Sequence, residues 1–381
     1  MTKPTRLFVD AHQFDHGFDG AASFIQGLYM ALVRQRPGAY KIYLGCAKPD
    51  KVLASFDGDP HFEAIRYGAN NRLRRLAYEI PKSVARVRPD FAHFQYFTPL
   101  IKTCPWIVTI HDVLFNDFPQ YFPPGYARVR NILFPLSAHR ADLLTTVSPY
   151  SKERIAAWYG IEPARINVVP NGVNVNRADE VTMPPPGPEV AELVAAAAGY
   201  LLCVSRFEPR KNQAAVLHAF VDGGFWKQGM SLVFVGSRTL RGGDFDAAFA
   251  ALPSAAADRI RFLEGLSFAD VQRLYEHAVA AIYPSLAEGF GMPPLEAAVA
   301  GTPSLCARNT AMSDFTPLSP YFFEADDRAG LTLMLRDVVD HREDHRTLAG
   351  RIASEVAARY AWDTAAQVFG QLIDQFQGPA T

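Results

Sequence analysis

Two glutamates lie eight positions apart around a glycine-containing segment, Glu288 and Glu296 in the stretch EGFGMPPLE. Carboxylates accept hydrogen bonds from hydroxyl groups, and Gly289 and Gly291 let the backbone approach a ligand closely. The prolines at 293–294 predict the first turn of a helix, where unpaired N–H groups attract anions such as phosphate. A ligand with both phosphates and sugar hydroxyls, such as a nucleotide sugar, satisfies both features.

A second candidate pair, Arg206 and Lys211, brackets a short loop between a predicted strand and a predicted helix in the segment 200–220. Two cations beside a helix N-terminus suit a diphosphate group. A surface ion pair is the alternative interpretation. The position of this pair upstream of the two-glutamate segment favours a shared anion site.

A third candidate pair, His111 and Asp112, directly follows the apolar run WIVTI (106–110), which predicts a strand. Open α/β sheets bind ligands beyond the carboxyl ends of their strands, so this pair is a candidate for ligand contact. A histidine packed in a loop is the alternative.

A cluster of acidic residues and histidines begins at the last residue of the first predicted strand, RLFVD (6–10), and continues into the loop after it: Asp10, His12, Asp15, His16 and Asp19. Its spacing matches no standard metal-ligand motif, so we expect no metal there. Gly17 and Gly20 are expected to shape this loop.

The elements that must position these residues alternate between strand-like and helix-like runs throughout the chain. This alternation predicts α/β architecture with two doubly wound sheets. We expect an N-terminal domain at 1–180, a proline-rich linker at 181–199, a second domain at 200–360 and a final helix within 361–381. The linker holds four prolines between positions 181 and 190.

The chain has 381 residues with 49% hydrophobic content, enough for two cores of ordinary size. Its four scattered cysteines form no C-x-x-C pair, which favours reduced thiols over a disulfide or zinc framework. No apolar stretch reaches the length of a spanning helix, and the first residues lack the apolar core of a signal peptide. We therefore expect a cytoplasmic protein.

Charge is divided unevenly although the whole chain has a net charge of −1. Residues 1–180 carry 22 Lys and Arg against 16 Asp and Glu, and the remainder carries 16 against 23. The segment 70–90 alternates six cations with apolar residues, which indicates either a solvated helix face over the core or contact with an anionic membrane or acceptor. The overall balance and the absence of recognition motifs argue against nucleic-acid binding.

The segment PSLAEGFGMPPLEAAVAGTP resembles the E-x7-E signature of retaining GT-B glycosyltransferases of the family 4 type, which include bacterial polysaccharide mannosyl- and glucosyltransferases. Arg206 and Lys211 resemble the family's Arg-x4-Lys-Asn motif, and V-P-N-G-V (169–173) is typical of the end of its N-terminal domain. The glycine-rich first loop of the family is reduced here. This departure leaves the roles of His16 and Asp19 open.

The resemblance implies a GT-B fold, in which two Rossmann-like domains face each other across a cleft and the last helix crosses back to the first domain. It also implies a set of donor contacts. Glu288 accepts from the transferred sugar, Glu296 from the ribose, His111 reaches the sugar or its phosphate, and Arg206 with Lys211 grips the diphosphate. The loop residues Gly289, Phe290, Gly291 and Met292, together with Gly20 and Asp112, complete the expected substrate contacts, and the turn 263–266 lies near the base.

The implied activity is transfer of a hexose, with mannose from GDP-mannose favoured, to a glycan or lipid-linked acceptor. UDP-glucose and UDP-N-acetylglucosamine remain alternative donors, and an isomerase, a hydrolase or a nucleotide-sugar sensor remain alternative functions. Because protein cations hold the diphosphate, neither a cofactor nor a metal is expected. Peripheral contact with an anionic inner membrane surface is an expected partnership, whereas nucleic acid is not.

Overall fold

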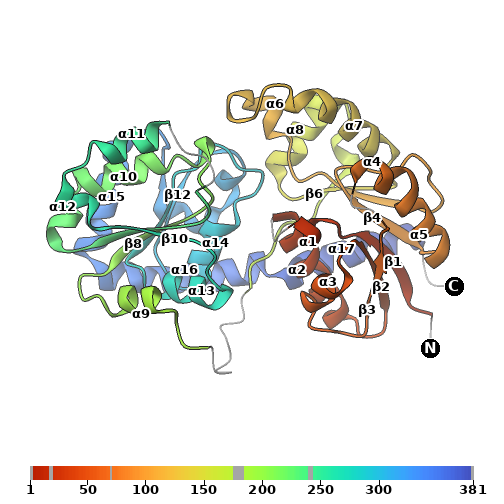
Figure 1. Cartoon of the computed structure of the whole chain (residues 1–381), viewed down its shortest axis with the longest axis horizontal. Coiled ribbons are helices and arrows are strands. Elements are labelled where there is room, and N and C mark those ends of the chain that lie inside the picture. Colours follow the sequence, from red (N-terminus) through yellow and green to blue (C-terminus); the bar gives the residue numbers. More distant parts are fainter. Residues whose placement is uncertain (1–2, 17–19, 69–70, 175–183, 239–242, 379–381) are drawn as a thin grey trace. The chain divides into compact units, whose positions relative to one another are not determined.

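The computed structural model describes residues 3–16, 20–68, 71–174, 184–238 and 243–378. The chain divides into two compact units, one formed by Met1–Gly172 with Trp362–Thr381 and the other by Val173–Ala361. In Figure 1 the colours of the two units follow this division, with the last helix in blue among the red helices of the first unit.

The first unit is built on a seven-stranded sheet in which every pairing is parallel. Its strands are β1 (Thr5–Asp10), β2 (Tyr40–Cys46), β3 (Phe62–Arg66), β4 (Phe91–Gln95), β5 (Trp106–Thr109), β6 (Leu143–Thr146) and β7 (Ile166–Val168). The spatial order β3-β2-β1-β4-β5-β6-β7 reverses direction between β1 and β4. That reversal is the switch point where doubly wound sheets bind ligands.

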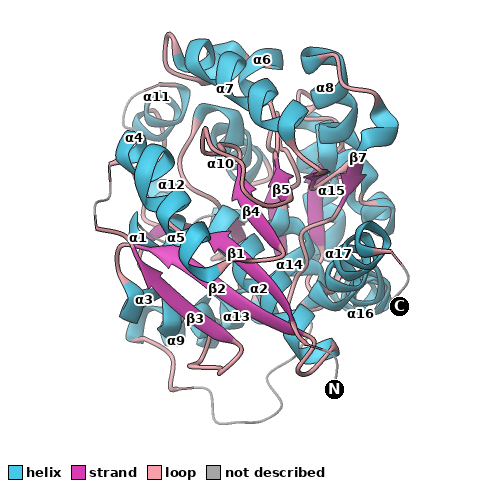
Figure 2. Ribbon diagram, turned by 90° about the vertical axis from the view of Figure 1, so that its right-hand side faces the viewer, coloured by secondary structure: helices cyan, strands magenta, loops and turns pink. Residues whose placement is uncertain are grey.

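Helices cover both faces of this sheet (Figure 2). One face packs against α5 (Ile80–Val87), α7 (Tyr126–Arg140) and α8 (Pro149–Tyr159), and the other against α2 (Gly20–Gln35) and α17 (Trp362–Gln377). The helices of the unit are α1 (Gln13–His16), α2 (Gly20–Gln35), α3 (Pro49–Ala54), α4 (Arg72–Arg74), α5 (Ile80–Val87), α6 (Leu114–Asp117), α7 (Tyr126–Arg140), α8 (Pro149–Tyr159) and α17 (Trp362–Gln377). Ser148 is the N-cap of α8 and accepts a hydrogen bond from the Ser151 N–H (3.0 Å), which fixes the start of this helix.

The second unit repeats the plan with a six-stranded parallel sheet. Its strands are β8 (Tyr200–Val204), β9 (Ser231–Val235), β10 (Ile260–Leu263), β11 (Ala280–Tyr283), β12 (Ser304–Ala307) and β13 (Phe322–Phe323). The order β10-β9-β8-β11-β12-β13 reverses between β8 and β11. The structure thus confirms the predicted pair of doubly wound α/β sheets.

The helices of the second unit begin earlier than the linker assignment allowed. They are α9 (Pro188–Ala195), α10 (Gln213–Asp222), α11 (Asp244–Ala250), α12 (Ser254–Ala257), α13 (Phe268–His277), α14 (Met292–Val299), α15 (Arg328–Asp340) and α16 (Arg342–Tyr360). Helix α9 lies inside the segment 181–199 that the sequence assigned to a linker. Its Val190 and Leu193 pack in the core of the second unit, because proline at its first turn starts a helix instead of excluding one.

Within the basic segment, residues 72–87 are helical, with a π-helix (Arg75–Glu79) between α4 and α5. Its buried apolar side chains Ile80, Val84 and Val87 belong to the core of the first unit. The alternation of charge and apolar residues therefore reflects core packing along α5. Arg75 is also buried, with its Nε 3.4 Å from Asp10 Oδ2.

Candidate functional site

The predicted donor-site residues of the second unit come from two loops that follow neighbouring strands. Strand β8 leads to the loop with Arg206 and Lys211, and β11 leads to the loop with Glu288. The chain leaves these adjacent strands at the point where the sheet order reverses. A backbone bond from Leu286 N–H to the Arg210 carbonyl (2.7 Å) joins the loops.

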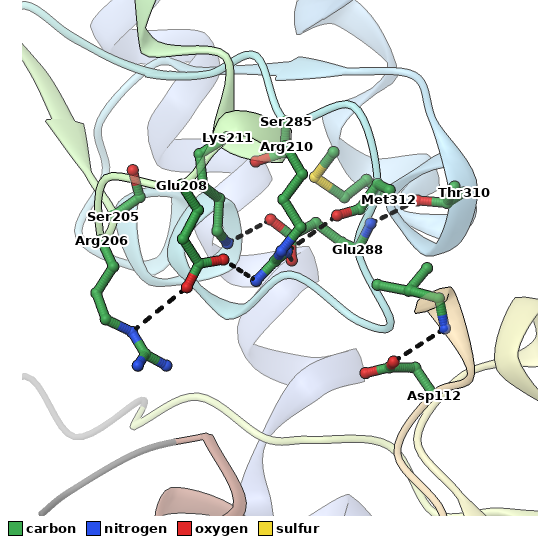
Figure 3. Close-up of polar contacts among 12 residues, drawn as sticks. Asp112, Ser205, Arg206, Glu208, Arg210, Lys211, Ser285, Glu288, Thr310 and Met312 are labelled. Carbon is green, nitrogen blue, oxygen red and sulfur yellow. Dashed lines mark hydrogen bonds and ion pairs between the residues drawn. The ribbon is translucent and has the colours of Figure 1, made fainter. Parts of the chain in front are cut away.

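The strongest contacts of this site hold one carboxylate between two cations (Figure 3). Lys211 Nζ lies 2.5 Å from Glu288 Oε1, and Arg210 Nη1 lies 2.7 Å from Glu288 Oε2. Arg210 Nη1 also donates to the Ala287 carbonyl (3.0 Å). The side chains of Lys211 and Glu288 are only 13% and 10% exposed, so solvent screens these contacts weakly.

Burial and charge act in opposite directions on Glu288. Burial raises the pKa of its carboxyl, but the charges of Lys211 and Arg210, with hydrogen bonds from Lys211 and Ser285, lower that pKa to about 2. Glu288 is therefore a carboxylate throughout the physiological range. A nearby charged partner favours the ionised form in this way.

Arg206 stands apart from this cluster. Its side chain is 63% exposed, and its Nε lies 3.9 Å from Glu208 Oε1. Glu208 turns its other oxygen toward Arg210 Nη2, at 2.8 Å. The two predicted cations thus differ, since Lys211 is bound to Glu288 while Arg206 extends toward solvent (Figure 3).

The Glu288 loop ends at the N-terminus of α14, as the prolines predict. Gly291 is the N-cap with φ +98°, a conformation that favours glycine, and a Cβ there would lie 3.0 Å from Met312 Cγ. Phe290 is buried against Phe315 and Tyr360, with ring centroids 5.4 and 6.3 Å away. Because the ring of Phe290 is part of the core, only its backbone is available to contact a ligand.

Glu296 lies on α14, where it accepts a hydrogen bond from the Tyr275 hydroxyl (3.1 Å). Burial raises the pKa of Glu296, and the bond from Tyr275 offsets part of that rise. Glu288 and Glu296 share a motif and a residue type, yet their pKa values shift in opposite directions. Only Glu288 has cations beside it.

Thr310 supports the Glu288 loop from a strained backbone. Its Oγ1 accepts a hydrogen bond from the Glu288 N–H (2.9 Å), while its own φ is +45°. Positive φ is costly for a β-branched residue and persists where the surroundings impose it. Thr310 thus fixes the position of the carboxylate-bearing residue.

A pocket opens between these elements within the second unit. Three of its lining residues lie at the ends of the strands β8 and β11, namely Cys203, Val204 and Tyr283. The other nine come from the segments that follow strands and from the start of α14: Ser205, Lys211, Pro284, Ser285, Glu288, Gly291, Pro293, Pro294 and Met312. Lys211, the carboxylate of Glu288 and the N-terminus of α14 therefore surround one space. An anion that enters it meets Lys211 and the first turn of α14 together.

His111 and Asp112 follow β5 in the first unit, as predicted. His111 is 7% exposed, its Nε2 lies 2.7 Å from Gln95 Oε1, and burial lowers its pKa to about 4. Asp112 Oδ1 accepts a hydrogen bond from the Leu114 N–H (3.1 Å). The imidazole is therefore neutral near pH 7.

Gly20 is the exposed first residue of α2, and a Cβ at this position would meet nothing within 4 Å. Its conformation therefore gives no steric reason for glycine. Residues 17–19, which include Gly17 and Asp19, lie outside the described residues.

The acidic residues after β1 have structural partners. Asp10 Oδ1 accepts from the Tyr67 hydroxyl (3.0 Å), and Asp15 accepts from the N–H groups of Ala47 and Lys48 (2.9 and 2.8 Å). Among the described residues, no group of three or more His, Cys, Asp or Glu is arranged to hold a metal ion. No helix in the described part of the chain could cross a membrane.

The predicted base-contact turn 263–266 begins at the last residue of β10. Glu264 Oε1 in this turn accepts from the Arg238 N–H (2.9 Å). Gly265 has φ +68°, a conformation that suits the turn.

The sequence analysis named both Lys211 and Glu288 but missed two residues that contact Glu288, Arg210 and Thr310. Arg210 directly precedes Lys211, so the sequence shows its charge. Its contact with Glu288 joins residues 78 positions apart, which no local pattern predicts. Thr310 lies 22 positions from Glu288 and carries no motif.

Two family models match the chain. The model "Glycosyltransferase Family 4" covers residues 18–177, and "Glycosyl transferases group 1" covers residues 193–315. Each match falls within one of the two doubly wound units, apart from a few residues at the boundary.

Similar proteins agree with this assignment. The O-antigen chain mannosyltransferase RfbU of Salmonella typhimurium is 26% identical over 347 residues, which cover 85% of this chain and 90% of that protein. The fold is similar to sucrose-phosphate synthase from Thermosynechococcus elongatus (TM-score 0.74, 17% identity, 99% and 100% of the two chains). It is also similar to Anabaena HepE in complex with UDP-glucose (TM-score 0.71, 17% identity, 97% and 99%). The chain belongs to glycosyltransferase family 4, the retaining glycosyltransferases of the GT-B fold.

Proposed function

We propose that this glycosyltransferase moves mannose from GDP-mannose to a hydroxyl group of a glycan or lipid-linked acceptor during polysaccharide biosynthesis. The observation that carries the proposal is the cluster of Lys211, Arg210 and Glu288 beside the N-terminus of α14. This cluster offers positive charge for a diphosphate and a carboxylate for sugar hydroxyls in one pocket.

The leaving group gains negative charge as the bond between the anomeric carbon and the diphosphate oxygen breaks. Lys211, Arg206 and the N–H groups at the start of α14 would stabilise that charge, which is the main catalytic task when the leaving group is already good. Arg206 is exposed and long enough to fold onto a bound phosphate. With these cations in place we propose that transfer needs no divalent metal.

The hydroxyl groups of the donor would be held by the two motif glutamates and by His111. Glu288 remains ionised and accepts from the transferred sugar, while Glu296 accepts from the ribose. The acceptor hydroxyl forms the new bond to the anomeric carbon on the face that the diphosphate leaves. Its proton passes to the departing phosphate oxygen, so the configuration is retained without a protein nucleophile.

Mannose is favoured because RfbU, which resembles this chain over most of its length, is an O-antigen chain mannosyltransferase. UDP-glucose is the competing donor, and its support is the likeness to HepE, whose structure holds it. That likeness extends to the fold at 17% identity. The match of higher sequence identity, 26% against 17%, therefore favours mannose in this proposal.

A contact with anionic lipid would use the exposed side of the 70–90 segment. Arg72, Arg74, Lys82 and Arg86 are exposed there, as is the side chain of Leu73 (76%). Cations around an exposed apolar side chain suit the surface of an anionic bilayer. Binding to vesicles with and without anionic lipid tests this part of the proposal.

The donor is tested by the thermal stability of the purified protein with GDP, UDP, ADP and their sugar conjugates, in EDTA throughout. A ligand that binds only the folded state raises the melting temperature. We expect saturable stabilisation by GDP and GDP-mannose. Stabilisation by UDP or UDP-glucose alone would replace the proposed donor.

The type of reaction is tested by product analysis with GDP-mannose and a glycan acceptor extract. We expect a mannosylated product and free GDP, both dependent on the acceptor. Turnover without acceptor would instead indicate a hydrolase or an isomerase. Binding without turnover in any extract would indicate a nucleotide-sugar sensor.

A further inference from the structure

A row of buried polar side chains crosses three neighbouring strands of the first sheet. His93 and Gln95 lie on β4, Thr109 pairs in register with Gln95 on β5, and Thr145 pairs with Thr109 on β6. All four are at most 3% exposed. Burial of polar groups is costly unless each one is hydrogen-bonded, so their partners matter.

Helices α2 and α17 cover this row. Tyr29 of α2 and Phe369 of α17 pack on the His93 ring, with centroids 5.9 and 5.6 Å away. The Tyr29 hydroxyl lies 2.7 Å from His93 Nδ1, and Thr109 Oγ1 lies 2.7 Å from His93 Nε2. The row therefore joins α2 to the sheet through one imidazole.

Gln95 links that imidazole to the candidate site residue His111. Its Oε1 lies 2.7 Å from His111 Nε2, and its Nε2 lies 3.1 Å from His93 Nε2. The oxygen of an amide only accepts hydrogen bonds, and its nitrogen only donates them. One of the two ring nitrogens must therefore carry a proton while the other must be bare, whichever way the amide is turned.

Both rings are neutral near pH 7, so each carries a single proton. Burial lowers the pKa of His111 to about 4, and burial with the nearby His111 lowers the pKa of His93 to about 3. Each ring then exists as one of two tautomers. With one Nε2 protonated and the other bare, the two rings must be opposite tautomers.

We infer that Gln95 is a positioning residue that couples the tautomer of His111 to that of His93, and through His93 to the hydroxyl of Tyr29. With Gln95 Oε1 turned toward His111, the His111 proton is on Nε2, and Nδ1 can accept a hydrogen bond. His93 then carries its proton on Nδ1 and donates it to the Tyr29 oxygen. If the amide turned over, His111 would instead carry its proton on Nδ1.

The backbone beside Gln95 holds the His111 ring in place. Tyr96 has φ +65°, and the Phe97 N–H donates to the Gln95 carbonyl (2.7 Å), which closes a γ-turn. Such a conformation is strained for an aromatic residue and is typical of functional sites. The Tyr96 and Phe24 rings contact His111, with centroids 5.3 and 5.1 Å away, so the imidazole has little freedom to rotate.

The consequence for transfer rests on the proposed function. If His111 contacts the donor sugar or its phosphate, the network decides whether its Nδ1 accepts from a hydroxyl or donates to a phosphate oxygen. Three titratable groups of the described residues lie near His111: Tyr96, whose ring contacts it, His93, which is linked to it through Gln95, and Asp112, which follows it in the chain. Tyr29 of α2 contacts His93. Asp112 donates no proton as a carboxylate and accepts from the Leu114 N–H.

Nitrogen-15 spectra of the full chain with labelled histidine test the coupling without any assay of activity. His93→Asn and His111→Asn variants assign the two rings by loss of their signals. We expect opposite tautomers in the parent at pH 7. In Tyr29→Phe the His93 Nδ1 proton loses its acceptor, so both rings are expected to exchange tautomers together. Identical tautomers in the parent, or a change in Tyr29→Phe that is confined to His93, would overturn the inference.

Replacements of Gln95 test the consequence for transfer. In Gln95→Glu a carboxylate accepts from both rings, so the pKa of His111 should rise by about one to three units and transfer should vary with pH between 5 and 8. Gln95→Leu should reduce transfer without adding that pH dependence. An equal loss at every pH in both folded variants would mean that Gln95 has only a packing role. Absence of transfer by the parent would count against the proposed function and leave the spectra as the measure of the coupling.

Discussion

At the carboxyl end of the second sheet, Lys211 and Arg210 hold Glu288 as fully charged groups, with N···O distances of 2.5 and 2.7 Å. At the carboxyl end of the first sheet, Gln95 joins His93 and His111 as neutral rings. The two sheets share their strand order up to the sixth strand. Lys211 and Glu288 lie in loops that follow strands of the second sheet, whereas His93 and Gln95 lie on β4 and His111 follows β5. The same backbone plan thus supports two different kinds of polar chemistry.

The two buried groups differ in charge because their hydrogen-bond partners differ in charge. Burial raises the pKa of Glu288, but two cations reverse that effect, so the charge persists. Burial lowers the pKa of His111, and its partner Gln95 is uncharged, so the ring stays neutral. A charged site suits a diphosphate, and a neutral site suits hydroxyl groups.

The largest effect is expected from loss of the charged site. Lys211→Ala should reduce transfer by roughly 100- to 1,000-fold, because one donor to the developing phosphate charge is removed. It should also weaken nucleotide binding, and more so at low salt. Steady-state kinetics and calorimetry measure both effects.

Lys227→Ala is the matched control, since Lys227 is an exposed cation over the Trp226 ring, 5.3 Å from its centroid. It should leave transfer unchanged. Equal nucleotide affinity and equal kcat in Lys211→Ala and the parent would remove Lys211 from the site.

The next effect concerns the neutral site. His111→Ala should reduce transfer by roughly 10- to 100-fold, which corresponds to about 1.5–3 kcal/mol for one hydrogen bond to a charged group of the substrate. Because the pKa of His111 is lowered to about 4, the ring is neutral above about pH 5. The loss should therefore be the same from pH 5.5 to 8, as kcat/KM profiles of parent and variant would show. An inflection near pH 6.5 that disappears in the variant would mean that a charged imidazole takes part.

The exposed His139 on α7 supplies the control for this comparison. Its ring contacts the Tyr159 carbonyl at 3.1 Å, within the first unit. His139→Ala should leave the profile of the parent intact.

More residues of the charged site than of the neutral site could be predicted from the sequence, for a physical reason. The charges of Lys211 and Glu288 lie in short segments where strand, loop, glycine and proline follow one another, so local pattern predicts their position. Gln95 and His93 lie inside a buried strand, where two polar residues interrupt an apolar run without any motif. Their function depends on register with Thr109 and on Tyr29 of α2, neither of which is a local property.

Elements were missed for related reasons. The edge strand β3 and the two-residue β13 are specified by pairing with β2 and β12 rather than by their own sequences. Helix α9 was hidden by the prolines on its N-terminal side, which also fit a linker. The strained positions at Tyr96 and Thr310 carry ordinary residues where glycine would be expected. Only tertiary contacts hold such residues at positive φ.

A smaller effect should appear in acid. The pKa of Glu288 falls from its ordinary 4.5 to about 2 in the folded chain, so this group stabilises the fold above pH 4.5. That stabilisation is lost as pH falls toward 2. Between pH 5 and pH 3 the free energy of unfolding should therefore fall by roughly 1–3 kcal/mol less in Glu288→Gln than in the parent. Denaturant unfolding at each pH measures this difference. Glu324→Gln, at an exposed pair with Arg308, should titrate like the parent. Parallel losses in all three proteins would show that Glu288 is not held by its cations.

The smallest effect is expected at Thr310, where two contributions can be separated. Thr310→Ala removes the acceptor of the Glu288 N–H and keeps the strained φ of +45°, so it should cost about 1 kcal/mol of stability and several-fold in transfer. Thr310→Ser keeps the hydroxyl and removes the β-branch, so it should match the parent. Kinetics and unfolding of the two variants compare the contributions directly. If the serine variant loses as much transfer as the alanine variant, the methyl group rather than the hydroxyl holds the loop. The charged site would then depend on packing, as His111 does between Tyr96 and Phe24, and not on a hydrogen bond to its backbone.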